Sequence, residues 1–164
     1  MRFTIRHEVA VPPARAVAAY SSPAFYEGRP PRDNIAVHGV VLHEVHTDRV
    51  VMEVRFAFTG HVSPAVRAVV DPSKLSWVTR TEVRPADARA TWVVRADHYP
   101  DRLSARGEYR FEPGPQGPVG TLVLVDGDLK VRVPIVGRSV ERVIVSGLRE
   151  YLEDEVASIA GFSG

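Results

Sequence analysis

The chain of 164 residues is 45% hydrophobic and carries a formal net charge of +1, with 21 basic and 20 acidic residues interleaved. This length and composition predict one domain, residues 1–164, that can bury a core, and the near-neutral charge gives no indication of a nucleic-acid partner. The absence of cysteine excludes disulfides, thiolate metal ligands and a cysteine nucleophile.

The chain is predicted to begin with a strand and two short helices. Apolar and polar residues alternate over residues 3–9, which is the pattern of a half-buried strand. A proline pair then begins a short helix over residues 14–20. The pair Ser22-Pro23 is typical of the start of a second short helix, which ends at Gly28.

Six strands joined by short turns are predicted next. They cover residues 35–45, 49–59, 75–84, 89–99, 102–112 and 119–133, with one or two helical turns over residues 63–70. Prolines and glycines fill the connections, and such short connections indicate antiparallel neighbours. In the last strand, Asp126-Gly127 is either a bend or a hairpin turn, and the unbroken alternation across it favours the bend.

The last predicted element is one long helix over residues 135–160, about 38 Å long at 1.5 Å per residue. Pro134 suits its first turn, and no proline follows it. The helix has one broad apolar face and an opposite charged side, so it requires a large apolar partner, which must be the sheet. The apolar face consists of Val140, Val143, Ile144, Gly147, Leu148, Tyr151, Leu152 and Ile159.

This order of elements predicts an α+β helix-grip fold, a curved antiparallel sheet of about seven strands wrapped round the C-terminal helix. The chain resembles the START-like superfamily, also called SRPBCC or Bet v1-like. Its strand-to-helix junction, with Val131, Val133, Pro134, Gly137 and Glu141, resembles an uncharacterised bacterial branch related to polyketide cyclases. The resemblance implies a cavity between sheet and helix that holds an apolar small molecule, and it implies no cofactor.

The candidate ligand-binding residues lie on the predicted inward faces of the strands and on the apolar face of the helix. The same composition is typical of a filled core, so both interpretations stay open. Gly147 either leaves room for a ligand or allows close packing of the helix on the sheet. The candidates are Met52, Val54, Phe56, Phe58, Trp77, Thr79, Trp92, His98, Tyr109, Thr121, Val140, Ile144, Gly147 and Tyr151.

Three polar residues are candidates for chemistry. His98 and Tyr109 are predicted to point inward from neighbouring strands, where they would bind one polar end of a ligand or transfer protons, or else satisfy each other structurally. Glu141 and Glu155 fall within the apolar arc of the helix, so each requires a partner. For Glu141 we expect the helix N-terminus and an arginine, with an acid or base role as the alternative.

Other signals predict no metal site and no membrane segment. His43 and His46 would point to opposite faces of a strand, which separates them as metal ligands. The N-terminus has no hydrophobic signal region and no apolar run approaches the ~20 residues of a membrane span, so we predict a cytoplasmic protein without membrane insertion.

Three classes of function remain. The first is binding of a hydrophobic or amphipathic small molecule such as a lipid, polyketide, isoprenoid or quinone. The second is a polyketide cyclase or aromatase that uses His98, Tyr109 and Glu141. The third is a protein-interaction module with a filled core. Cavity volume separates the third class from the first two, because a ligand site requires about 300 Å³ or more. The sequence gives no prediction of the oligomeric state.

Overall fold

The computed structural model describes residues 1–29, 34–61, 63–68, 71–115, 117–132 and 137–162. Their element order is the predicted one, with two additional 3-10 turns, η1 and η2. The predicted helix residues 135–136, strand residue 133 and helical-turn residues 69–70 lie outside this range. The elements are β1 (Arg2–Val9), α1 (Pro13–Tyr20), α2 (Pro23–Glu27), β2 (Ile35–Val45), β3 (Val50–Phe58), α3 (Pro64–Arg67), η1 (Pro72–Lys74), β4 (Ser76–Arg84), η2 (Pro85–Asp87), β5 (Arg89–Ala96), β6 (Leu103–Gly114), β7 (Gly117–Val131) and α4 (Gly137–Ile159).

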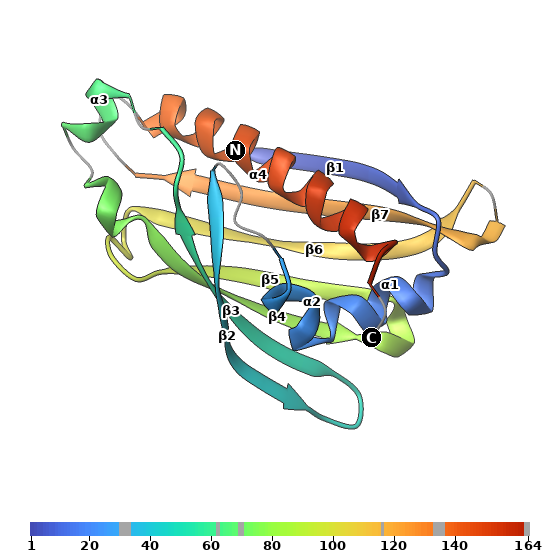
Figure 1. Ribbon diagram of the computed structural model, residues 1–164. Coiled ribbons are helices and arrows are strands. Elements are labelled where there is room, and N and C mark those ends of the chain that lie inside the picture. The colour runs from blue at the N-terminus through green and yellow to red at the C-terminus, as the bar shows by residue number, and fades with distance from the viewer. Residues whose placement is uncertain (30–33, 62, 69–70, 116, 133–136, 163–164) are drawn as a thin grey trace.

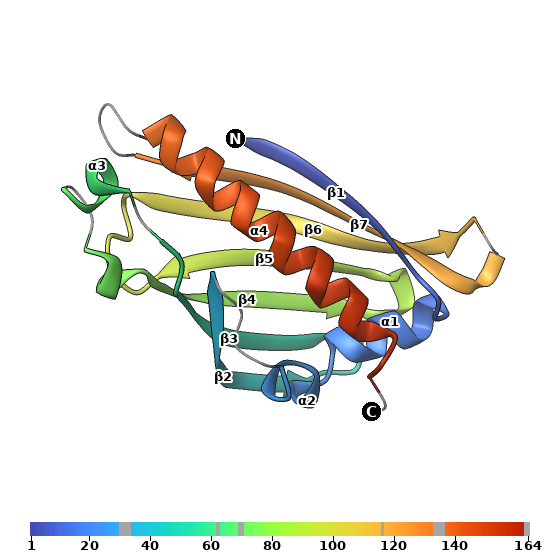
Figure 2. The same cartoon turned by 45° about the horizontal axis from the view of Figure 1, so that its top comes forward.

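The strands form one seven-stranded sheet in the order β1-β7-β6-β5-β4-β3-β2, and every neighbouring pair is antiparallel. Helix α4 crosses the concave face of this sheet diagonally and packs on β7 and β1 (Figures 1 and 2). Helices α1 and α2 lie at the end of the sheet near the C-terminus of α4, and α3 lies at the opposite end. The predicted helix-grip fold is therefore confirmed.

The two halves of α4 are buried to different extents. In the C-terminal half, Leu152, Val156 and Ile159 are almost completely buried, at 3%, 0% and 0% exposure. In the N-terminal half, Val140 and Ile144 face the sheet but remain partly exposed. The described side chains therefore cover the N-terminal half of the helix less completely than the C-terminal half.

Strand β7 runs without interruption through the predicted bend. Its register with β1 is regular from Thr121 to Asp128, which excludes a hairpin turn at residues 126–127. Gly127 pairs with Gly107 on β6, and the ring of Phe3 lies where a side chain at Gly127 would project. The two glycines therefore allow aromatic rings to lie directly on the backbone of the sheet.

We expect Gly107→Ala to lower the free energy of unfolding by about 1–3 kcal/mol, because it overpacks this contact. A Cβ atom at Gly107 would lie 2.0 Å from the carbonyl oxygen of Asp126 and 2.5 Å from the Trp92 ring. Urea denaturation measures the change. Gly147→Ala is the control, since a Cβ atom there meets no atom of the described part of the chain within 4 Å. Equal stability of the Gly107 variant and the wild type would contradict the prediction.

Candidate functional site

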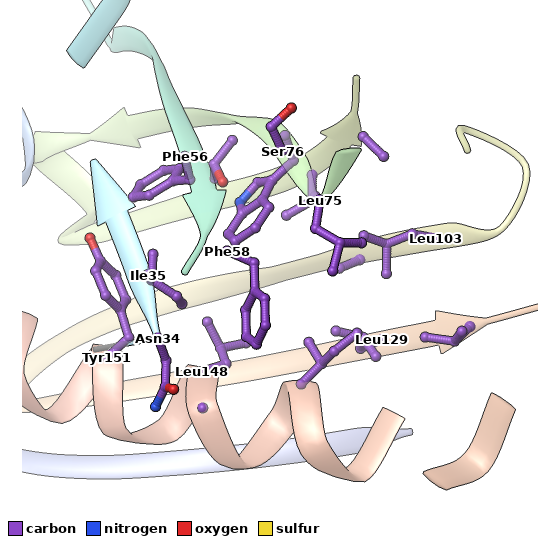
Figure 3. A pocket seen from close by; sticks show the side chains of 18 of the residues that line it. Asn34, Ile35, Phe56, Phe58, Leu75, Ser76, Leu103, Leu129, Leu148 and Tyr151 are labelled. Atoms are coloured by element: carbon purple, nitrogen blue, oxygen red, sulfur yellow. The ribbon is translucent and has the colours of Figure 1, made fainter. Parts of the chain in front are cut away.

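A cavity of about 340 Å³ lies between the concave face of the sheet and α4. Its wall is mostly apolar, and side chains from β3, β4, β6, β7 and α4 point into it (Figure 3). The predicted ligand-binding residues that line it are Val54, Phe56, Phe58, Trp77, Thr79, Trp92, His98, Tyr109, Val140, Ile144, Gly147 and Tyr151.

Aromatic contacts connect the helix to the sheet along one wall of the cavity. The ring of Phe56 stacks on Trp77 at 5.8 Å between centroids, with 14° between the planes. The ring of Tyr151 meets Phe56 edge to face at 5.8 Å. These contacts fix the distance between α4 and strands β3 and β4, and with it the width of the cavity.

Gly147 borders the cavity and is not closely packed. Among the described residues, a Cβ atom there would have no atom within 4 Å, apart from its own chain neighbours and the nearby helix backbone. The alternative that this glycine allows close packing of helix on sheet is therefore wrong. The missing side chain leaves space in the cavity.

Met52 and Thr121 are buried as predicted but do not line the cavity. Met52 belongs to the hydrophobic core, and the hydroxyl of Thr121 donates a hydrogen bond of 2.6 Å to the carbonyl oxygen of Val11. The strand alternation placed both side chains on the correct face. The cavity nevertheless occupies only part of that face, because the core and α1, which packs on β6 and β7, fill the rest.

The prediction that His98 and Tyr109 meet at one polar end of a ligand is wrong. Strand β5 ends at Ala96, so the alternation stops before His98, which is exposed at the edge of the cavity. Tyr109 is buried and pairs with Ala90. Ala90 lies six residues before the end of β5 at Ala96, roughly 20 Å along the strand, and His98 lies beyond that end.

Glu141 does not line the cavity. Its carboxylate accepts a hydrogen bond of 2.8 Å from the backbone N–H of Val131 and lies 3.7 Å from the amino group of Met1. No arginine pairs with it among the described residues, contrary to our expectation. Glu141 instead joins the first turns of α4 to the end of β7.

The polar groups that do border the interior of the cavity form a cluster at its closed end. We call this the polar cluster; its members are Tyr20, Tyr26, Arg29, Tyr109, Tyr151 and Glu155, of which Tyr26, Tyr109, Tyr151 and Glu155 line the cavity. Arg29 and Glu155 form a 2.8 Å ion pair with side chains only 6% and 3% exposed. Arg29 also donates a 3.2 Å hydrogen bond to the Tyr151 hydroxyl.

The tyrosine hydroxyls of the polar cluster remain protonated. Burial raises the pKa of Tyr20, Tyr26, Tyr109 and Tyr151 well above its ordinary value, and the negative charge of Glu155 raises it further. Each hydroxyl is therefore a neutral group that can donate a hydrogen bond at neutral pH.

Sequence reasoning recognised that Glu155 requires a partner but did not find Arg29 or the converging tyrosines. These residues come from α1, α2, β6, α4 and the segment after α2, so no local spacing connects them. The one local signal is Tyr151 four residues before Glu155, on the same face of α4.

The opposite end of the cavity is open to solvent. Its lining there includes the exposed residues His61, Ser63, Lys74, His98 and Arg102. Along β6, the open end near Leu103 and the closed end at Tyr109 are six residues apart, roughly 20 Å. The cavity is thus an elongated apolar space with a basic open end and a buried, neutral, polar closed end.

The described residues contain neither a metal-binding cluster nor a membrane-spanning helix. No group of three or more His, Cys, Asp or Glu side chains there is arranged to hold a metal ion. Within the same residues, no helix combines the length and the apolar character needed to cross a membrane.

Known structures share this fold at low sequence identity. A protein from Thermus thermophilus superposes with a TM-score of 0.67 at 14% identity, covering 98% of this chain and 95% of that one. The Zhui aromatase/cyclase from a Streptomyces species gives 0.66 at 14%, covering 98% and 94%. A START superfamily protein from Mycobacterium smegmatis gives 0.57 at 18%, covering 94% and 96%.

These similarities establish the START-like, or SRPBCC, fold of the chain and leave its ligand open. A comparison with curated proteins gave no significant match. The match to a sequence family is nevertheless almost complete, since it covers residues 4–162. The chain therefore belongs to the family described as protein of unknown function (DUF2505).

Proposed function

We propose that the protein binds a hydrophobic or amphipathic small molecule, such as a lipid, polyketide, isoprenoid or quinone, between the sheet and α4. The observation that carries this proposal is the apolar cavity of about 340 Å³, which lies within the size range of ligand pockets. A protein interior is normally packed to the density of an organic crystal, so an unfilled space of this size weighs against the filled-core interaction module.

The cyclase or aromatase alternative has weaker support. One structural neighbour is an aromatase/cyclase, but a sequence identity of 14% to this chain indicates only a shared fold. The proposed catalytic residues His98, Tyr109 and Glu141 are separated in space, and Glu141 lies outside the cavity lining. General acid–base chemistry requires the groups to reach one bound substrate, which this arrangement does not provide.

Native mass spectrometry of the purified protein tests the proposal. We expect a bound small molecule that organic extraction removes, after which the protein rebinds a fluorescent fatty-acid probe. A protein that carries no molecule and binds no such probe would contradict ligand binding.

The predicted cytoplasmic location is tested separately, by fractionating cells that express the protein.

A further inference from the structure

Several buried polar atoms at the closed end of the cavity have no hydrogen-bond partner among the described residues. They are Oε1 of Glu155, the hydroxyl of Tyr20 and Nη2 of Arg29, all in the polar cluster. Buried polar groups are almost always hydrogen-bonded, and leaving one unpaired is costly. Tyr20 and Glu155 interact with each other, but no hydrogen bond of ordinary geometry from the described residues reaches these three atoms, so the polar cluster can still form hydrogen bonds with a ligand.

Oε1 of Glu155 decides what kind of group fits there. Its partner oxygen Oε2 accepts from Arg29, whereas no hydrogen bond of ordinary geometry reaches Oε1, although the hydroxyls of Tyr20 and Tyr151 lie near enough to Glu155 to interact with it. The Glu155 side chain also borders the cavity. A group that enters the closed end must therefore donate a hydrogen bond. The Tyr109 hydroxyl also borders the cavity and is protonated, so it can donate to the same group.

The charges of the polar cluster balance each other, which disfavours an ionised ligand group at the closed end of the cavity. Arg29 and Glu155 neutralise each other at 2.8 Å, and the surrounding tyrosines are neutral. A carboxylate or an ammonium group at the closed end would thus be a buried charge without a counter-charge, which is strongly unfavourable. A neutral hydroxyl group, by contrast, both donates and accepts a hydrogen bond.

We propose that the closed end of the cavity recognises a neutral hydroxyl group, a phenol or an alcohol, at the leading end of an otherwise apolar ligand. The ligand hydroxyl donates to Oε1 of Glu155 and accepts from the hydroxyl of Tyr109. The apolar remainder lies along Phe56, Trp77 and Ile144 toward the open end, roughly 20 Å away. This inference rests on the proposed function and adds the chemical class of the ligand.

Two probes that differ in a single donor test the inference. Calorimetry compares para-octylphenol with para-octylanisole, in which a methyl ether replaces the hydroxyl. We expect the phenol to bind about 10-fold more tightly or better, since a hydrogen bond to a charged group is worth about that factor. Without a partner in the cavity, the phenol would be the weaker ligand, because its hydroxyl would lose water and gain nothing.

The outcomes separate this inference from the proposed function. If both probes bind with equal affinity, or the anisole binds more tightly, hydroxyl recognition is wrong while ligand binding in the cavity stands. If neither probe binds, both are wrong. A clear preference for the phenol supports both.

Tyr109→Phe locates the preference at the closed end. The variant keeps the ring and removes only the hydroxyl, so the preference for the phenol should fall several-fold. Tyr99→Phe makes the same change at another residue of the cavity lining, beside Arg102 at the open end, and should leave the preference unchanged. The reverse pattern would place the hydroxyl at the open end and overturn the inference. Tyr109 is preferable to Glu155 here, because removing Glu155 leaves Arg29 buried without its partner.

Discussion

Glu155→Leu is expected to lower the free energy of unfolding by about 3–5 kcal/mol, the largest stability effect that the structure indicates for one side chain. The reason is Arg29, whose side chain is only 6% exposed and has Glu155 as its ion-pair partner. Its guanidinium lies 4.7 Å from the centre of the Tyr151 ring, within cation–π distance, but this contact cannot replace a full negative charge. Chemical denaturation in urea measures the loss.

The double variant Arg29→Leu with Glu155→Leu is the decisive control. Removing both charges eliminates the unpaired charge, so the double variant should be more stable than Glu155→Leu alone. Asp48→Asn breaks the exposed ion pair with Arg49 and should cost less than about 1 kcal/mol. If Glu155→Leu cost no more than Asp48→Asn, the buried pair would not have the importance that we assign to it.

Gly147→Leu should abolish binding of apolar probes while leaving the protein folded and at least as stable. The leucine side chain projects into space where a Cβ atom has no contact within 4 Å with the described residues, between Ile144 and Tyr151 on the cavity side of α4. Replacing glycine within a helix gains up to about 1 kcal/mol. Affinity for para-octylanisole should fall at least about 10-fold, because the side chain occupies volume that the ligand needs.

The control for this variant is Gly147→Ala, which gives a similar gain in helix propensity with a much smaller side chain. It should raise the thermal midpoint and keep most of the binding. A Gly147→Leu protein that still binds the probe normally would show that the ligand does not occupy this part of the cavity. A destabilised Gly147→Leu protein would show that the space closes in solution.

The sequence alone determined the fold, because the relevant signals are local. Alternation of apolar and polar residues with a period of two predicted the strands, and one long amphipathic pattern predicted α4. The short connections that contain proline and glycine predicted that neighbouring strands are antiparallel. The same alternation placed Phe56, Trp77 and Tyr109 on the concave face, where they line the cavity. Alternation fails where a strand ends, which is why His98 was misplaced after β5 stopped at Ala96.

Only the tertiary structure decided which part of the concave face is open and which polar groups meet there. Met52 and Thr121 lie on the predicted face, yet the core fills their surroundings, and no pattern within β3 or β7 records that. Arg29 and Glu155 are 126 residues apart and come together because Arg29, two residues after the end of α2, contacts Tyr151 and Glu155 on α4. Likewise, Gly147 had two opposite interpretations until its surroundings were known. Periodicity reports how one segment divides its side chains between two faces, whereas a cavity is the volume that all segments together leave unfilled.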